Sequence, residues 1–533
     1  MAAVQSSSTG ADLLVERLRA HGVRHVFGYP GGQITPIYDA LYREPTIRHV
    51  LARDEQAAAF MADGYARATG KPGVCLAVCG PGVLNAATPL ASAFTDSVPV
   101  LLISGQVATA GLGVRSGSYH ENDQLGACAT FTKWRGRAIE VSTIVPGIDG
   151  AWGALTNGRP GPALFEVPVD VLRGRVEAAA TVPFPPPICP ATVAPDKVKA
   201  LADLVAQWRK PLIIAGGGVM AAGAELSLVH LAERLGAPVF TTLMGKCAIA
   251  SDHPLAMGLP WHGATSDVSD MRQFMSPLFD QTDGVLAIGC RFSQVSSGSW
   301  SLPMVALLAH IDIDPAEIGR HYGVTLGIQA DAKEALQALL GLLPTKKRPP
   351  WATRTPREPW RLPGIDLLGP MRRVLPRDAI IAADITRLSY IMLAEFPVYQ
   401  PRTLLHPAGF VPMGFGIPAA LGAKAAFPER TVVAVVGDGC FLMSAMELAT
   451  AVQENLPIIV ILINDNSLTL IKAIQQRRYE NRFIGVDLRN PDFQLLAKAF
   501  GVCSWQVDSD PDFEMALREA VALREPALIE VRV

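Results

Sequence analysis

Two aspartates in the last third of the chain have the residue type and spacing to hold a hard metal ion. Asp438 and Asp465 each follow a short apolar run, and carboxylate oxygens suit Mg²⁺ or Ca²⁺. The N–H groups of Gly439 and Cys440 would favour an anion beside the metal. These residues predict a metal-bridged diphosphate, although Asp between two glycines is also a common turn sequence.

The segment 432–467 must position these carboxylates. Residues 432–436 and 458–463 are β-branched runs without alternation, as buried parallel strands require. Between them, apolar residues from Phe441 to Val452 recur every three or four positions and predict one amphipathic helix. In a right-handed βαβ unit the carboxyl ends of both strands meet at one sheet edge, where open α/β sheets bind ligands.

The composition limits the function classes that remain. A chain of 533 residues predicts about three or four domains. The net charge of −2 and the lack of a basic run give no field for nucleic acid. No apolar run is long enough for a membrane span, and no signal peptide is evident. The eight scattered cysteines are typical of buried thiols in a reducing compartment. We therefore expect a soluble cytoplasmic protein with no membrane partner.

Two proline-rich stretches divide the chain into thirds. Adjacent prolines disfavour helix and central strand, so 181–190 and 343–363 are predicted to be extended linkers. The predicted α/β domains span 1–180, 191–342 and 364–533.

The outer thirds share a weak internal repeat. Each contains a proline, a buried strand, a Gly-X-Gly turn, a helix and a second strand that a proline opens, with turns beginning at Gly80 and Gly437. A repeat at this separation indicates a duplicated domain. The turn is GPG in the first copy and GDG in the second, so only the second can hold the metal.

The stretch from GDG to NDNS resembles the cofactor motif of thiamine diphosphate enzymes. In that family the first Asp, a later Asn or Asp, and a group two residues further on hold Mg²⁺. The resemblance thus implies Asp438, Asp465 and Ser467 as metal ligands. The segment VLARDEQAAAFMADGYARATGKPGV is similar to the acetolactate synthase branch at its cofactor-activating glutamate, which matches Glu55. The preceding residue, usually His, is Asp54 here.

The resemblance spans nearly the whole chain. FGYPGGQITPIYDAL matches the family with Gln33 where a small residue is usual, and GFVPMGFGIPAALGA places Met413 where the cofactor bends. The implied fold is three doubly wound parallel-sheet domains, namely pyrimidine-binding, middle and diphosphate-binding. The implied cofactor-binding residues are Pro30, Gly31, Glu55, Thr386, Arg387, Leu388, Met413, Gly437, Asp438, Gly439, Cys440, Asp465, Ser467 and Leu470.

The middle third is similar to the FAD-binding domain of acetolactate synthases. The order AGGG, TTLMG, WHGAT, GCRF and HIDIDPAEIG carries this likeness. Where flavin-binding members usually continue with two acidic residues and Arg, the chain has Ser293, Gln294 and Val295. Binding of FAD, weak binding and loss of FAD are three open alternatives.

The resemblance implies decarboxylation of a 2-oxo acid such as pyruvate, followed by carboligation to a second carbonyl compound. Glu55 would activate the cofactor, and His120 is a further acid–base candidate. The substrate pocket would contain Gln33, His120, Glu121 and Ile474. Ile474 stands where biosynthetic acetolactate synthases usually have Trp.

Two other functions remain as alternatives. One is a non-oxidative 2-oxo acid decarboxylase or acyloin lyase, of the benzoylformate decarboxylase or benzaldehyde lyase type. The other is a non-catalytic homologue, against which the intact Glu55, Asp438 and Asp465 speak. The family also implies a homodimer or homotetramer in which the N-terminal domain serves its neighbour's cofactor. The sequence leaves a regulatory subunit open.

Overall fold

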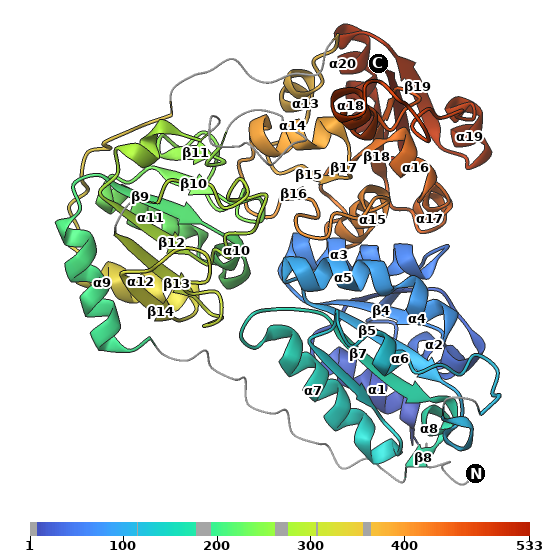
Figure 1. Cartoon of the computed structure of the whole chain (residues 1–533). Helices are drawn as coiled ribbons and strands as arrows, with labels where there is room; N and C mark the ends of the chain where they lie inside the picture. Colours follow the sequence, from blue (N-terminus) through green and yellow to red (C-terminus); the bar gives the residue numbers. More distant parts are fainter. Residues whose placement is uncertain (1–7, 114–115, 177–192, 262–274, 305–306, 355–363) are drawn as a thin grey trace.

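The computed structural model shows three α/β bodies. In Figure 1 the N-terminal third (blue) lies below the C-terminal third (orange to red), and the middle third (green to yellow) lies beside them. No helix in the described part of the chain is long and apolar enough to cross a membrane. The described residues are 8–113, 116–176, 193–261, 275–304, 307–354 and 364–533.

The N-terminal third contains a six-stranded parallel sheet of order β3-β2-β4-β5-β7-β6. Its strands are β2 (His25–Gly28), β3 (Arg48–Leu51), β4 (Gly73–Ala77), β5 (Val100–Gln106), β6 (Trp134–Arg137) and β7 (Ala163–Pro168). Its helices are α1 (Gly10–Ala20), α2 (Thr35–Tyr42), α3 (Glu55–Thr69), α4 (Pro81–Asn85), α5 (Ala87–Asp96), α6 (Gln124–Ala127), α7 (Ile144–Thr156) and α8 (Val169–Arg173). The short strands β1 (Ser8–Thr9) and β8 (Arg175–Val176) pair antiparallel at one side.

The C-terminal third repeats this topology. Its parallel sheet has the order β16-β15-β17-β18-β20-β19, which is the same relative order as in the N-terminal sheet. The predicted internal repeat is therefore confirmed. Its strands are β15 (Ile380–Ala383), β16 (Leu404–Leu405), β17 (Val432–Gly437), β18 (Ile458–Asn464), β19 (Cys503–Val507) and β20 (Ala527–Arg532). Its helices are α13 (Leu368–Val374), α14 (Arg387–Glu395), α15 (Gly416–Ala426), α16 (Asp438–Leu442), α17 (Glu447–Gln453), α18 (Thr469–Arg478), α19 (Phe493–Ala499) and α20 (Asp510–Leu523).

The middle third has a different strand order. Its six parallel strands run β11-β10-β9-β12-β13-β14, the order of a doubly wound dinucleotide-binding fold. The strands are β9 (Pro211–Ala215), β10 (Val239–Thr241), β11 (Ala256–Gly258), β12 (Gly284–Ile288), β13 (Leu308–Asp312) and β14 (Leu326–Gln329). The helices are α9 (Pro195–Gln207), α10 (Gly217–Ala222), α11 (Glu225–Leu235) and α12 (Ala332–Leu342). The predicted fold class, three doubly wound parallel-sheet units, is confirmed.

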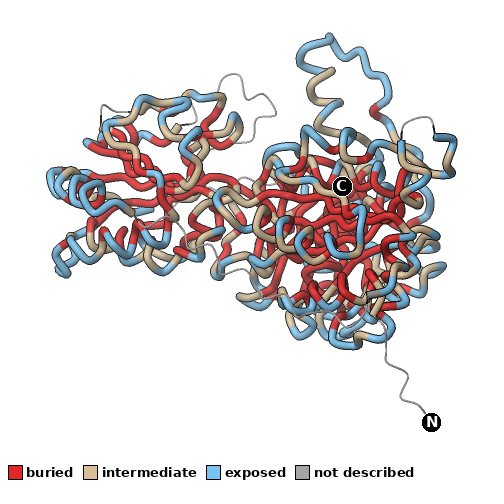
Figure 2. The backbone as a smooth tube through the Cα atoms, turned by 90° about the horizontal axis from the view of Figure 1, so that it is seen from below, coloured by how far each residue is buried: buried red, intermediate tan, exposed pale blue. Residues whose placement is uncertain are grey.

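Helices α3 and α15 form the contact between the two outer thirds. One buried cluster includes side chains of α3, α15 and the facing strands of both sheets. The helices approach so closely that a Cβ on Gly64 would lie 2.3 Å from the Ala419 carbonyl oxygen. Figure 2 shows these outer thirds as one lobe with buried strands (red) at its centre, and the middle third as a second lobe.

Some local expectations are confirmed and others are wrong. The strands predicted at 432–436 and 458–463 are observed as β17 and β18, and helix α3 is followed by Gly70, which has the left-handed φ of +72°. The single helix predicted between β17 and β18 is instead α16 and α17, with a break at 443–446. Cys503 is exposed, so the expectation of buried cysteines fails there.

The structure describes only part of the two predicted linkers. Residues 181–190 and 355–363 of the linkers, 262–265 of WHGAT, and Cys189 lie outside the described residues. The start of the second linker packs back on the middle third, because the Trp351 indole donates to the Pro211 carbonyl at 2.6 Å. The domain limits themselves stay predictions.

Candidate active site

The carboxyl ends of β17 and β18 carry the two predicted metal-binding aspartates. Asp438 begins α16 and is only 3% exposed. Its Oδ1 accepts a hydrogen bond from the Gly439 N–H at 2.8 Å, and its Oδ2 accepts one from the Asn490 amide at 2.7 Å. Burial, with a contribution from Asp465, raises the pKa of Asp438 above its ordinary value. A divalent cation would relieve this accumulation of negative charge.

Asp465 is oriented by the loop that follows β18. Its Oδ1 accepts from the Ser467 N–H at 3.1 Å, and its Oδ2 accepts from the Thr469 hydroxyl. The Ser467 hydroxyl donates to the Val486 carbonyl at 3.1 Å. These bonds fix the loop before any ligand binds.

Asn490 completes this edge and was missed in the sequence. Its amide group lies 3.1 Å from Asn464 Oδ1 and 3.2 Å from Asn466 Oδ1, besides its bond to Asp438. Its own Oδ1 is buried, and none of the residues that the structure describes forms a hydrogen bond with it. The only local signal was an Asn-Pro step, which reads as a turn.

The donor set fits a hard cation. No group of three or more His, Cys, Asp and Glu side chains that could hold a metal occurs among the described residues. Asp438 and Asp465 would therefore supply the protein carboxylates, with further oxygens from Ser467, a diphosphate and water. Mg²⁺ binds in this way, with few carboxylates and several phosphate or water ligands.

The two glycines at the start of α16, Gly437 and Gly439, pack closely against neighbouring side chains. A Cβ on Gly439 would lie 2.9 Å from Leu468 Cδ2, and one on Gly437 would lie 3.2 Å from Thr386 Cγ2. The Cys440 thiol points inward, because Sγ donates to the Ile385 carbonyl at 3.1 Å.

The predicted residues of α14 have different surroundings. Thr386 is the N-cap of α14, and its hydroxyl accepts from the Ser389 N–H at 3.0 Å. Arg387 is exposed at the helix start. The Leu388 side chain is 2% exposed and belongs to the core. Only the backbone of Leu388 is therefore suited to the predicted cofactor contact.

Met413 and α18 lie around the same turn. Met413 is half-buried, and its Cε lies 3.5 Å from the point where a Cβ on Gly439 would stand. Leu470 and Ile474 are half-buried on α18, a helix with no fully buried residue. Their side chains remain partly available to a ligand.

Glu55 is the first residue of α3 and is 9% exposed. The Asn85 amide donates to its Oε2 at 3.0 Å, and a Cβ on Gly82 would lie 2.9 Å from its Oε1. The carboxylate thus rests against the GPG turn of the first repeat. Burial, followed by repulsion from Glu55, raises the pKa of Asp54.

The YPGG loop lies at the end of β2. Pro30 is exposed, and Gly31 packs so closely that a Cβ there would lie 2.6 Å from Val78. Gln33 is half-buried in a short 3₁₀ helix, η1 (Gly32–Ile34). Its backbone carbonyl lies 2.8 Å from where a Cβ on Gly105 would stand.

His120 sits in a strained position beside the GPG turn. Its φ is +70°, its ring stacks on Tyr119 at 3.8 Å, and its Nδ1 is buried without a hydrogen-bond partner among the described residues. The Glu121 carboxylate accepts a hydrogen bond from the Gly113 N–H at 3.3 Å. Gln124, another residue missed in the sequence, accepts from the Gly80 N–H at 2.9 Å. A left-handed, unpaired histidine is the kind of outlier that accompanies function.

The site residues form two groups within one chain. Glu55, His120 and the YPGG loop belong to the N-terminal sheet, whereas Asp438, Asp465 and Met413 belong to the C-terminal sheet. Among the described residues, no hydrogen bond or ion pair links Glu55 to either aspartate.

Three family models match the chain along its length. They describe the N-terminal TPP binding domain, the central domain and the C-terminal TPP binding domain of thiamine pyrophosphate enzymes, and they match residues 8–127, 198–339 and 384–531. Thiamine pyrophosphate is another name for thiamine diphosphate.

Curated relatives agree with these matches. A probable acetolactate synthase large subunit of Methanocaldococcus jannaschii is 36% identical over 98% of this chain and 91% of its own length. The acetolactate synthase large subunit of Corynebacterium glutamicum is 35% identical over 98% and 86%, respectively. A probable 2-ketoarginine decarboxylase of Pseudomonas aeruginosa is 36% identical over 99% and 94%.

The predicted resemblance is thereby confirmed, and it covers all three parallel-sheet units. The chain belongs to the thiamine pyrophosphate enzyme family and is an enzyme of the acetolactate synthase-like type.

Proposed function

We propose that this enzyme decarboxylates a 2-oxo acid such as pyruvate and joins the remaining acyl unit to a second carbonyl compound, with thiamine diphosphate and Mg²⁺. The observation that carries the proposal is the joint presence of a buried Glu55 against the GPG turn and the Asp438–Asp465 pair at the matching edge of the repeated sheet. The acetolactate synthase relatives give the reaction type.

Residues of the two groups would bind different parts of the cofactor. Asp438, Asp465 and Ser467 would hold Mg²⁺, and the Gly439 and Cys440 amides would face the diphosphate. Bound thiamine diphosphate supplies carbanion stabilisation. Glu55, oriented by Asn85 at 3.0 Å, would hold a proton at the pyrimidine end of the cofactor.

The remaining predicted residues would shape the pocket. Met413 would press on the cofactor from the C-terminal side. His120 would exchange a proton with substrate, because its Nδ1 has no hydrogen-bond partner in the described part of the chain. Gln33, Glu121 and Ile474 would line the substrate pocket. These assignments rest on position and on family membership.

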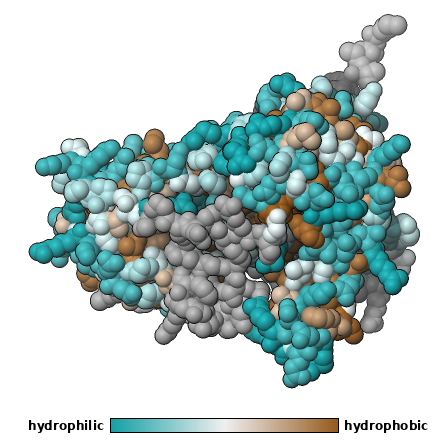
Figure 3. Space-filling view, turned by 90° about the horizontal axis from the view of Figure 1, so that it is seen from above, coloured by the Kyte–Doolittle hydropathy of each residue, from teal (hydrophilic) through white to brown (hydrophobic). Residues whose placement is uncertain are grey.

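The two groups of site residues favour a homodimer. Three exposed apolar side chains lie next to the Asn85–Glu55 pair or at the end of α16. They are Leu84 (48% exposed), Leu442 (42%) and Met443 (52%). The face shown in Figure 3 is largely hydrophilic with separate apolar patches. We infer that a second copy covers the apolar side chains and brings its Glu55 to this chain's aspartates. A homotetramer stays a prediction, and the presence of a regulatory subunit stays open.

The middle third leaves FAD as a secondary proposal. A Cβ on Gly216 would lie 2.0 Å from the Gly289 carbonyl oxygen, so the glycine loop packs against β12. Burial raises the pKa of Asp312, at the end of β13, to about 6. The visible spectrum of purified protein decides whether flavin is present.

A second candidate function is a non-oxidative 2-oxo acid decarboxylase. The 36% identity to a probable 2-ketoarginine decarboxylase favours it, as does Ile474 in place of Trp. A lyase that cleaves acyloins belongs to the same alternative.

Turnover of pyruvate with thiamine diphosphate and Mg²⁺ separates the candidates. Equal amounts of carbon dioxide and acetolactate would support carboligation. Carbon dioxide with free aldehyde would support the decarboxylase. If pyruvate is inert, 2-ketoarginine and aromatic 2-oxo acids are the next substrates, and no turnover of any 2-oxo acid or acyloin would contradict the proposal.

The metal assignment has its own test. Asp465→Asn keeps an oxygen ligand, whereas Asp465→Ala removes it. We expect the Asn variant to retain Mg²⁺-dependent cofactor binding within about tenfold, and the Ala variant to lose about a hundredfold or more, because even the outer partners of metal ligands are worth about 10–100-fold. Equal binding by both variants would exclude Asp465 as a ligand. Calorimetric titration measures both.

A further inference from the structure

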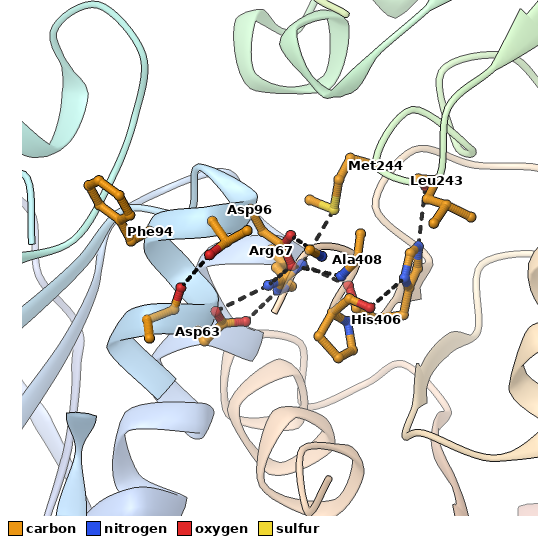
Figure 4. A network of polar contacts seen from close by, with 12 residues as sticks. Asp63, Arg67, Phe94, Asp96, Leu243, Met244, His406 and Ala408 are labelled. Carbon is orange, nitrogen blue, oxygen red and sulfur yellow. Dashed lines mark hydrogen bonds and ion pairs between the residues drawn. The ribbon is translucent and has the colours of Figure 1, made fainter. Parts of the chain in front are cut away.

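A buried arginine connects all three thirds of the chain. Arg67, near the end of α3, has a side chain 5% exposed, and its carboxylate partners Asp63 and Asp96 are 0% exposed. Its guanidinium also donates to the His406 carbonyl at 2.8 Å and approaches Met244 Sδ at 3.6 Å. Figure 4 shows these residues converging from the N-terminal, middle and C-terminal thirds.

Such a cluster needs a reason other than stability. Burying three charges costs several kcal/mol per ion, and apolar replacements are often as stable. A buried network instead fixes one arrangement of the elements that it joins. The question is which element Arg67 and its partners fix.

Asp96 holds a loop of the C-terminal third, residues 406–414, between β16 and α15. Its Oδ2 accepts from the Ala408 N–H at 2.9 Å, and its Oδ1 accepts from the Gly409 N–H at 2.8 Å. The contact is tight, because a Cβ on Gly409 would lie 2.2 Å from Thr95 Cγ2. Both carboxylate oxygens of Asp96 therefore bind this loop, while Arg67 holds the carboxylate at 2.9 Å.

A second buried carboxylate holds the loop's other end. Asp384 accepts from the Gly414 N–H at 3.1 Å and from the Gly416 N–H at 2.7 Å. Between the two anchors, Val411 has a φ of +56°, an unfavourable conformation for a β-branched residue. Met413 lies in this strained stretch, with its Cε against Gly439.

We propose that Asp96 and Arg67 are positioning residues for the cofactor, because they hold the 406–414 loop in the form that places Met413 at the Gly439 turn. The proposal rests on the proposed cofactor contact of Met413. Among the described residues, no hydrogen bond or ion pair joins Asp96 or Arg67 to Asp438. Helix α3 would then serve two purposes, since it begins with Glu55 and ends with the anchor of this loop.

Asp63 provides a matched control. Asp96→Asn and Asp63→Asn each remove one buried negative charge from Arg67, but only Asp96 binds the loop. Gly409→Ala is a second test variant, because its Cβ would push the loop away from Thr95 while all three charges stay. It keeps the test available if Asp96→Asn folds poorly.

Three measurements on the full-length protein decide the matter. They are hydrogen exchange of peptides covering 404–416 without cofactor, the dissociation constant for thiamine diphosphate with Mg²⁺, and the thermal unfolding midpoint. We expect Asp96→Asn and Gly409→Ala to speed exchange in the loop and to weaken cofactor binding about tenfold or more, since one charge-assisted hydrogen bond is worth at least about 1.4 kcal/mol. Asp63→Asn should lower only the midpoint.

Two results would overturn the proposal. One is unchanged loop exchange in Asp96→Asn, and the other is equal weakening of cofactor binding by Asp63→Asn and Asp96→Asn. Failure of the wild-type protein to bind thiamine diphosphate would instead refute the proposed function. The exchange measurement uses the cofactor-free protein, so the two failures can be told apart.

Discussion

Glu55 combines burial with a single well-placed partner. The Asn85 amide orients Oε2, and the absence of a side chain at Gly82 leaves room beside Oε1. A carboxylate held in this way exchanges a proton at one defined point. Asp54, one residue earlier, lies instead on the cavity side lined by Glu447 and Met443.

Replacing Glu55 with Gln should abolish most turnover while the cofactor still binds. The amide keeps the size and the contact with Asn85 but cannot take up a proton. We expect kcat to fall about 10²–10⁴-fold, the usual contribution of acid–base catalysis, with the dissociation constant of thiamine diphosphate within about threefold, because uniform binding is unaffected. Steady-state kinetics and calorimetry measure the two quantities.

Asp54→Asn is the control for Glu55. It removes the neighbouring carboxylate, whose pKa is raised mainly by burial, without touching the GPG turn. Its kcat should stay within about tenfold of the wild type, since it has no assigned proton-transfer role. Full activity in Glu55→Gln would show that Glu55 does not activate the cofactor.

At the residue scale, the sequence allowed prediction of groups with local signals. Asp438 sits in a GDG turn after a buried strand, and Glu55 lies in a segment that resembles the acetolactate synthase branch. Asn490 has no such signal, because its partners are distant in the chain. Arg67 has a local partner in Asp63, but its contacts with Asp96 and with the carbonyl of His406 are distant in the chain. Only the folded arrangement identifies them.

At the element scale, the contact of α3 with α15 depends on two glycines. A Cβ on Gly64 would lie 2.3 Å from the Ala419 carbonyl oxygen, and one on Gly422 would lie 1.9 Å from the Met61 carbonyl oxygen. Backbone atoms cannot move aside as side chains do. The distance between the outer thirds is therefore set by the absence of side chains here.

Gly64→Ala should destabilise the protein despite the higher helix propensity of Ala. We expect a loss of about 1–3 kcal/mol from overpacking, measured as a lower thermal midpoint. Gly341→Ala in α12 is the matched control, because its Cβ would meet nothing within 4 Å. That variant should gain up to about 1 kcal/mol. Similar midpoints for both variants would contradict close packing of α3 on α15.

Glu447 makes the same interface sensitive to pH. It begins α17, is 0% exposed, and accepts from the Arg53 N–H at 2.9 Å and the Thr450 hydroxyl at 2.7 Å. Burial, with a contribution from Asp54, raises the pKa of Glu447 from 4.5 to about 7. The native state therefore binds more protons than the unfolded state between these values, and its stability falls as the pH rises through this window.

Glu447→Gln should remove this pH dependence. Relative to the variant, the wild type should lose up to about 3 kcal/mol between pH 4.5 and pH 8, because each pKa unit corresponds to about 1.4 kcal/mol. Urea unfolding of both proteins at several pH values measures the difference. A difference that is constant with pH would mean that Glu447 is ionised normally.

The elements themselves were predictable where periodicity was strong. The two strands β17 and β18 lie where the sequence placed them. The break between α16 and α17 was not predicted, because Ala445 and Leu448 continue the apolar spacing across it. Met443 and Met446 at the break are exposed in one chain. The spacing of apolar residues along a helix does not show whether they face the core or a partner chain.

At the scale of the whole molecule, two sheets of one topology carry the two groups of proposed site residues. The GPG copy rests against Glu55, whereas the GDG copy carries Asp438. The α3–α15 contact joins the two sheets within one chain but leaves Glu55 unlinked to Asp438. A second copy, related by a twofold axis, would create two equivalent sites, each with one half from each chain.

Mixing two inactive variants tests this arrangement. Glu55→Gln lacks the proton-transfer group, and Asp438→Ala lacks the metal ligand, so each homodimer should be inactive. In a heterodimer, one site would receive both lesions and the other would receive none. Random pairing in co-expressed protein should therefore restore about a quarter of wild-type activity, as expected for sites shared across a twofold interface.

The alternative makes the opposite prediction. If Glu55 and Asp438 of the same chain served one cofactor, every site in the mixture would carry a lesion, and activity would stay at the level of the separate variants. A mixture of wild type with the double variant, Glu55→Gln and Asp438→Ala on one chain, is the control. The shared site predicts no intact site in its heterodimers, so only its wild-type homodimers contribute, at about a quarter of wild-type activity. Because the control contains the same substitutions in the same proportions, sites shared between chains predict equal activity for the two mixtures, whereas sites within one chain predict about half of wild-type activity for the control and none for the mixture of single variants.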